Sequence, residues 1–123
     1  MIEEQYVSFD TAKMLKEAGF DVPTVRYYHK DGSMSAMSLD AQRHLSKIYK
    51  DIDTYPLPTQ ALAARWLREV HEIDVMIDVY NRDYYVCNVY KNKHLMIINN
   101  IVTSDFEEAL EEGLKEAIKL IKK

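Results

Sequence analysis

PLPTQALAARWLREVHEIDVMIDVYNRDYYVCNVYKNKHLMIINNIVTSDFEEALEEGLKEAIKLIKK, residues 56–123, is the stretch that decides the fold. Helical spacing of apolar residues changes to strand-like alternation, and then back to helical spacing, along this stretch. Short polar connections at 81–83 and 91–94 separate the alternating runs, and their lengths suit hairpins. We therefore expect a helix capped by Thr59, strands over 74–80, 84–90 and 95–101, and a closing helix from Phe106 to Ile121.

The two helices in this stretch show start signals and buried faces. Leu62, Trp66 and Val70 form a stripe at four-residue spacing in the first helix. Ser104 and Glu107 have the spacing of a capping box for the last helix, in which Ser104 would be the cap. A glycine inside the last helix, at position 113, destabilises that helix by about 1 kcal/mol relative to alanine. We expect it where that helix approaches the sheet closely.

The register of the expected sheet divides its residues between two faces. If Tyr80 pairs with Tyr84, one face is plainly apolar and forms the core. We expect the core face to hold Val75, Ile77, Val79, Tyr85, Cys87, Val89, Met96 and Ile98. The opposite face is also too apolar to be left to water. The candidate interaction surface on that face consists of Tyr80, Tyr84, Tyr90, Leu95 and Ile97, and either residues 1–55 or a second copy of the chain would cover it.

The sequence of the N-terminal portion, residues 1–55, predicts a helix followed by a hairpin. Ser8 or Asp10 can cap the helix, and Gly19 suits its C-terminal end. Asp31-Gly32 favours a hairpin turn in which both residues have positive φ. Residues 40–54 predict a short helix, and prolines then separate this portion from residues 56–123. We expect a single α+β domain over 1–123, in which the N-terminal helix and hairpin complete or cover a sheet of at least three antiparallel strands packed against two long helices.

The composition places the chain among ordinary globular proteins. Its 123 residues are 47% hydrophobic and 29% charged, with a net charge of −4. Neither end is a basic tail, no apolar run is long enough to span a membrane, and the acidic N-terminus does not resemble a secretory signal. The lone Cys87 can form no internal disulfide. These features predict a cytoplasmic protein.

The sequence indicates no catalytic, cofactor-binding or metal-binding residues. The four histidines, His29, His44, His71 and His94, show no metal-ligand spacing. Cys87 lies on the expected core face, and three glycines leave little scope for a phosphate-binding loop. The carboxylates of Glu107, Glu108, Glu111 and Glu112 are typical of a solvated helix face. We therefore expect a protein that is not an enzyme and that needs no cofactor.

The order helix, three strands, helix is also that of double-stranded-RNA-binding domains. Topology alone does not establish function, and duplex binding needs cations that neutralise phosphates. The start of the last helix is acidic instead. The cations of this region are Arg65, Arg68, Arg82, Lys91 and Lys93. Nucleic-acid binding through the Arg65 and Arg68 side is therefore kept as an alternative function, and the acidic start of the last helix argues against it.

Parts of the chain resemble a group of small proteins of unassigned function that recur in gut bacteria and in their phages and prophages. The resembling segments are 6–20, 55–71 and 106–121, and the block from Pro58-Thr59-Gln60 to Trp66-Leu67-Arg68-Glu69 is the most distinctive. The resemblance implies an accessory protein of a phage-related locus, and no functional residue carries over from it. We therefore expect a non-enzymatic interaction protein whose partner is either another protein or a second copy of the chain in a homodimer; the alternatives are the nucleic-acid-binding module and an enzyme with an unrecognised site.

Overall fold

The computed structural model describes residues 3–36 and 54–121, which form an α+β fold with three helices and antiparallel sheets. Short connections join most of the elements in this part of the chain. In chain order the elements are α1 (Phe9–Glu17), β1 (Arg26–His29), β2 (Met34–Ala36), β3 (Thr54–Pro56), α4 (Gln60–His71), β4 (Ile73–Val79), β5 (Tyr85–Lys91), β6 (His94–Thr103) and α5 (Phe106–Lys119).

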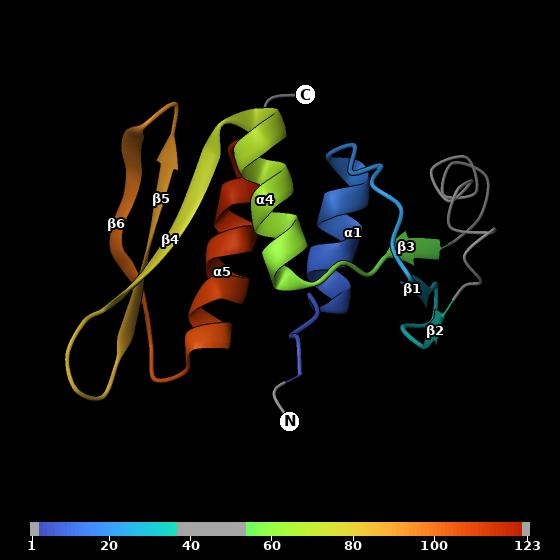
Figure 1. Ribbon diagram of the computed structural model, residues 1–123, viewed down its shortest axis with the longest axis horizontal. Helices are drawn as coiled ribbons and strands as arrows, with labels where there is room; N and C mark the ends of the chain where they lie inside the picture. The colour runs from blue at the N-terminus through green and yellow to red at the C-terminus, as the bar shows by residue number, and fades with distance from the viewer. Residues whose placement is uncertain (1–2, 37–53, 122–123) are drawn as a thin grey trace.

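The elements are stacked in layers along the long axis of the molecule (Figure 1). The sheet β4-β5-β6 lies at one end, and α4 and α5 cover one of its faces. Helix α1 packs against α5 on the side away from that sheet, and the small sheet β2-β1-β3 lies beyond α1. Helix α5 therefore lies between the main sheet and the N-terminal portion.

Helix α1 begins and ends as its sequence predicts. The Ser8 hydroxyl accepts the Thr11 N–H at 3.2 Å, so Ser8 is the N-cap. Gly19 has φ +94°, and the N–H of Phe20 donates to the Leu15 carbonyl at 2.9 Å. This arrangement satisfies the last carbonyls of the helix, and it folds the Phe20 side chain back into the core.

Helix α4 is capped as expected, but its buried face differs from the predicted stripe. The Thr59 hydroxyl accepts the Leu62 N–H at 3.1 Å, which confirms the cap. The buried apolar side chains are Ala63, Trp66 and Leu67. Val70 is exposed, so its assignment to the buried stripe was wrong. The buried face follows three- and four-residue steps from Gln60 to Leu67, and Val70 lies in the turn beyond it.

Helix α5 begins at Phe106, as expected, but its capping residue is not the one that the capping box predicts. Asp105, not Ser104, is the N-cap, and its carboxylate accepts the Glu108 N–H at 3.1 Å. Aspartate caps a helix about as well as serine does, and its negative charge also interacts favourably with the helix dipole. The choice between two adjacent capping residues depends on where the chain leaves the sheet, which the local sequence does not determine.

The main sheet has the first hairpin register that the sequence predicts. Tyr80 donates its N–H to the Tyr84 carbonyl at 3.0 Å, and Ile77 pairs with Cys87 in the middle of the hairpin. Cys87 and Val89 are fully buried beneath the helices, which confirms the core face at its centre, whereas Val79 at the end of β4 is 65% exposed, so its assignment to the core was wrong.

The second hairpin departs from the predicted register. Irregularities on either side of Val89 shift the pairing between β5 and β6, so that Tyr90 pairs with Leu95 and Cys87 pairs with Ile101. Met96 is 50% exposed and does not join the core as predicted. Bulges insert residues into one strand of a pair and therefore reset which side chains face the core.

The N-terminal hairpin forms a separate sheet and does not complete or cover the main one. Strand β1 pairs with β2 and with β3, and this small sheet lies on the far side of α1 (Figure 1). At the Asp31-Gly32 turn only Gly32 has a positive φ, +89°, so the two-residue turn expected there is not formed. The predicted helix over 40–54 falls outside the described residues, except that Thr54 begins β3.

Gly113 lies where α5 comes closest to the sheet, as the sequence predicts. A Cβ atom at this position would lie 2.3 Å from the Cys87 Sγ and 2.9 Å from the Val75 Cγ1. The missing side chain therefore lets the helix backbone rest on the centre of β5.

Candidate interaction surface

One face of the main sheet is open in the part of the chain that the structure describes. Helices α4 and α5 cover the inner face, and the described N-terminal elements lie beyond those helices (Figure 1). We call the other face the outer surface. It consists of Asp74, Met76, Asp78, Tyr80, Tyr84, Val86, Asn88, Tyr90, Leu95 and Val102.

The exposed side chains of the outer surface are large and mostly apolar. The exposed fractions are 56% for Tyr80, 53% for Met76 and 45% for Tyr84. Leu95 and Val102 are exposed to a similar degree, whereas Val86 on the central strand is buried among its neighbours. A sheet face with this composition is unusual for an isolated chain, because single exposed apolar residues are common but contiguous ones mark contact sites.

Most residues of the predicted surface lie on this face. Tyr80, Tyr84 and Leu95 are exposed, and Tyr90 is half-buried beside Leu95, its partner across the strands. The backbone of Ile97 pairs with that of Val89, which belongs to the core face. Ile97 is therefore not included in the outer surface.

Sequence reasoning did not place Val102 on the outer surface, and it assigned to the core two other apolar side chains of this sheet that are exposed, Val79 and Met96. Val102 pairs with Val86 because the bulge in β6 moves the register by more than one residue. Continuing the alternation of side chains from the hairpin turn could not reveal the position of Val102, because each bulge changes which face of the sheet the following side chains occupy.

A second feature is a hollow of about 920 Å³ between the N-terminal segment, β1 and the beginnings of α4 and α5. We call it the acidic hollow. Among the described residues that line it, Arg26 is the one cation. Its seven carboxylate-bearing residues are Glu3, Glu4, Asp105, Glu107, Glu108, Glu111 and Glu112. The sequence separates these residues into two groups, so only the packing of the N-terminal segment against α5 could bring them together.

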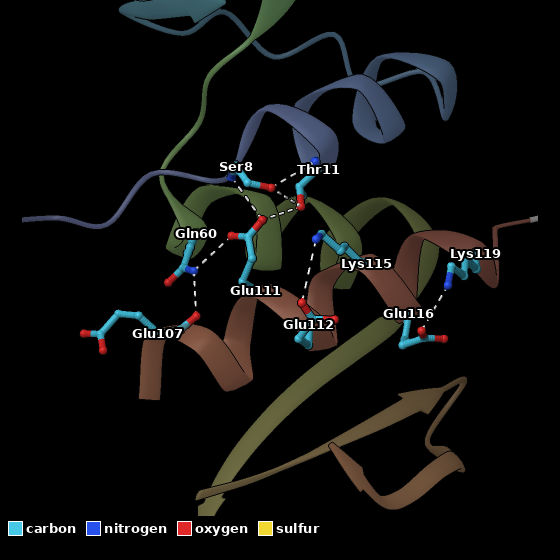
Figure 2. Close-up of polar contacts among 9 residues, drawn as sticks. All are labelled: Ser8, Thr11, Gln60, Glu107, Glu111, Glu112, Lys115, Glu116 and Lys119. Atoms are coloured by element: carbon cyan, nitrogen blue, oxygen red, sulfur yellow. Dashed lines mark hydrogen bonds and ion pairs between the residues drawn. The ribbon is translucent and has the colours of Figure 1, made fainter. Parts of the chain in front are cut away.

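Glu111 of the hollow connects three helices (Figure 2). Its carboxylate accepts the Ser8 N–H at 3.0 Å and a hydrogen bond from the Thr11 hydroxyl. The Gln60 amide donates to the same carboxylate at 3.1 Å and to the Glu107 carbonyl at 2.9 Å. Glu111 therefore places a negative charge at the start of α1, where the helix dipole is favourable.

The ionisation of Glu111 reflects these contacts. Burial alone would raise the pKa of this carboxyl group, but the hydrogen bonds from Thr11, Ser8 and Gln60 outweigh burial and lower it. The expectation that Glu111 belongs to a solvated helix face was therefore wrong. Glu107, Glu108 and Glu112 are exposed, as expected, and Glu112 pairs with Lys115 at 3.7 Å (Figure 2).

The thiol of Cys87 has surroundings that suppress its reactivity. The side chain is fully buried under Gly113, and burial raises its pKa to about 11. A thiol with this pKa is protonated at neutral pH, and the thiolate is the reactive form. Cys87 is therefore a packing residue. Among the described residues, no group of three or more His, Cys, Asp and Glu side chains could hold a metal ion.

Several cations of the C-terminal region are engaged within the chain. Arg65 pairs with Glu69 at 3.1 Å, and Lys93 pairs with Asp74 at 2.9 Å. The Lys91 ammonium group donates to the Leu120 carbonyl at 2.9 Å. These contacts reduce the positive charge that α4 and the strand loops can offer to a phosphate backbone. In the described part of the chain, no helix is both long and apolar enough to cross a membrane.

Comparisons with models of protein families, with curated proteins and with solved structures give no match to this chain.

Proposed function

We propose that this chain is a non-enzymatic interaction protein that binds another protein through the outer surface of the β4-β5-β6 sheet. The observation behind this proposal is the exposure of Met76, Tyr80 and Tyr84 on a face that no described element covers. Tyrosine and methionine are enriched at protein interfaces, because both bury large areas and tyrosine keeps a polar tip.

The resemblance to proteins of gut bacteria and their phages supports a more specific role, that of an accessory protein of a phage-related locus. Such a protein would act by occupying a surface of a partner. The contacts of Cys87 agree with a role that does not depend on a nucleophile, since its thiol packs against α5.

Duplex nucleic acid is the less favoured partner, although the order α4-β4-β5-β6-α5 matches an RNA-binding topology. The acidic hollow includes the first turns of α5, and its carboxylates would repel phosphates. Two of the candidate cations, Arg65 and Lys93, already pair with carboxylates. A salt-dependent shift with duplex RNA or DNA would favour this alternative over the protein partner.

Affinity purification from the native host tests the proposal. A tagged wild-type chain should retain a protein in stoichiometric amount, and Met76→Asp should lose it because a charge then interrupts the apolar surface. Asp21→Asn is the control, because Asp21 is exposed and follows α1, the helix that packs against α5 on the side away from the main sheet. Equal retention by the wild-type chain and by Met76→Asp would contradict the proposal.

Self-association requires its own measurement. Light scattering at micromolar concentration distinguishes a monomer from a dimer. A dimer that Met76→Asp converts to a monomer would identify the partner as a second copy of the chain.

A further inference from the structure

Asp78, the second-last residue of the edge strand β4, places a carboxylate among the apolar side chains of the outer surface. On its own strand it lies between Met76 and Tyr80, which point to the same face, and across the sheet it pairs with Val86. One carboxylate oxygen accepts the N–H of Val79 at 2.8 Å. No described lysine, arginine or histidine forms an ion pair with Asp78.

This charge restricts what can cover the surface. A wholly apolar partner would remove the carboxylate from water without compensation, which is costly for an ionised group. The cost falls when the covering group is a cation that also donates hydrogen bonds. The described strand residues of the outer surface include no lysine or arginine; Lys93 already pairs with Asp74, and Arg82 lies in the turn between Tyr80 and Tyr84.

The same argument disfavours a second copy of the chain. Closed dimers place the same surface on both sides of the interface, so each copy would bring its own Asp78. Two carboxylates near the symmetry axis would then be buried together, and the strands of the surface bring no cation to separate them. A different partner can supply the complementary charge.

The aromatic neighbours favour arginine over lysine as that cation. An arginine can donate two parallel hydrogen bonds to a carboxylate while its planar group stacks on a tyrosine ring. Tyr80 follows Asp78 on the same face, and Tyr84 pairs with Tyr80. A lysine ammonium group would satisfy the charge but is more strongly hydrated and does not stack.

We infer that the partner contacts the outer surface through an arginine placed on Asp78 and flanked by apolar side chains that contact Met76 and Val102. This inference rests on the proposed function and adds the chemistry of the partner. The partner is thus a protein segment in which a basic residue interrupts an apolar stretch.

A selection from random peptides displayed on yeast tests this inference against the immobilised full-length chain. Peptides of about twelve residues suffice, because a helix of that length, ~18 Å, covers most of the ~20 Å between Tyr84, just before β5, and Tyr90. The selected sequences should contain arginine between aromatic or aliphatic residues. Synthetic copies are then titrated by fluorescence anisotropy into the wild-type chain, Asp78→Asn, Met76→Asp and the control Asp21→Asn.

Asp78→Asn should weaken the binding of these peptides by about ten- to hundredfold, and Asp21→Asn should leave the affinity unchanged. Exchanging the charges, with glutamate in place of the peptide arginine and Asp78→Lys in the protein, should restore binding. Circular dichroism of each variant shows that the exposed substitutions leave the fold intact.

The opposing outcomes separate this inference from the proposed function. Two results would contradict the arginine contact while still supporting binding at the outer surface. In the first, the selected peptides lose binding to Met76→Asp but contain no arginine; in the second, they bind Asp78→Asn as tightly as the wild-type chain. A dimer that Met76→Asp dissociates would overturn it in favour of a second copy. A selection without any peptide that depends on Met76 or Asp78 would contradict both claims.

Discussion

Replacement of Gly113 by alanine tests the closest contact between α5 and the main sheet. The added Cβ atom would lie 2.3 Å from the Cys87 Sγ and 2.9 Å from the Val75 Cγ1. Ordinary van der Waals contacts begin near 3.4 Å, so the sulfur atom has to move by about 1 Å or the helix has to withdraw. Cys87 belongs to β5, which is hydrogen-bonded on both sides, so the strand can yield little.

The expected loss of stability follows from two opposing effects. Alanine favours a helix interior over glycine by about 1 kcal/mol. Overpacking a close-packed core costs roughly 1–3 kcal/mol, and an overlap this severe belongs at the upper end of that range. Gly113→Ala should therefore lower the free energy of unfolding by about 2 kcal/mol. For a domain of this size the melting temperature should fall by roughly 8 °C.

A double-mutant cycle with Cys87→Ala assigns the effect to this contact. Urea unfolding followed by circular dichroism gives the four free energies of unfolding. In the Cys87→Ala background the sulfur atom is absent, so Gly113→Ala should cost less than about 1 kcal/mol, with the remainder due to Val75. A Gly113→Ala chain as stable as the wild type, or an equal loss in both backgrounds, would refute the close-packing account.

Three further predictions concern the charge network, the outer surface and the thiol. Glu111→Gln should lower the free energy of unfolding by about 2 kcal/mol, because an amide cannot accept all the hydrogen bonds that reach this carboxylate, whereas Glu112→Gln should change it by less than about 0.5 kcal/mol. Similar urea midpoints for these two variants would count against the network. Because the folded pKa of Glu111 is lowered, its contribution should be complete at pH values above its ordinary pKa of 4.5 and should be lost as the pH falls through the folded pKa; a difference between wild type and Glu111→Gln that grows on acidification would contradict this sign. Met76→Thr and Leu95→Thr should change the free energy of unfolding by about 0.5 kcal/mol or less in the same urea titrations, because both side chains are exposed; a loss above about 2 kcal/mol would show that they support the fold. Cys87 should react with a thiol reagent at pH 8 only after denaturation, and rapid labelling of the folded chain would contradict its burial.

Local signals in the sequence predict the elements of the main module well. Thr59 and Gly19 occupy the helix ends expected of them, and the pairing of Tyr80 with Tyr84 fixes the first hairpin. Each of these features depends on a few neighbouring residues. The sequence therefore contains enough information to place the elements of this module and the centre of the core face, although Val79 at the end of β4 is exposed.

Features that depend on distant contacts could not be predicted in the same way. Met96 was assigned to the core because alternation was continued through a strand that contains bulges. Glu111 was assigned to a solvated face because nothing near it in sequence reveals that Ser8 and Thr11 pack against α5. The outer surface was recognised from alternation alone, but whether the N-terminal portion covered it depended on the tertiary arrangement.

Photo-cross-linking from the outer surface tests the central claim most directly. A benzophenone amino acid at position 84 replaces an exposed tyrosine of that surface, and the same amino acid at position 17 replaces Glu17 on α1 as the control. Irradiation of native host cells should give a discrete covalent adduct from position 84 that Met76→Asp abolishes, and none from position 17. Absence of an adduct from position 84, or the same adduct from both positions, would contradict the claim that this sheet face binds the partner.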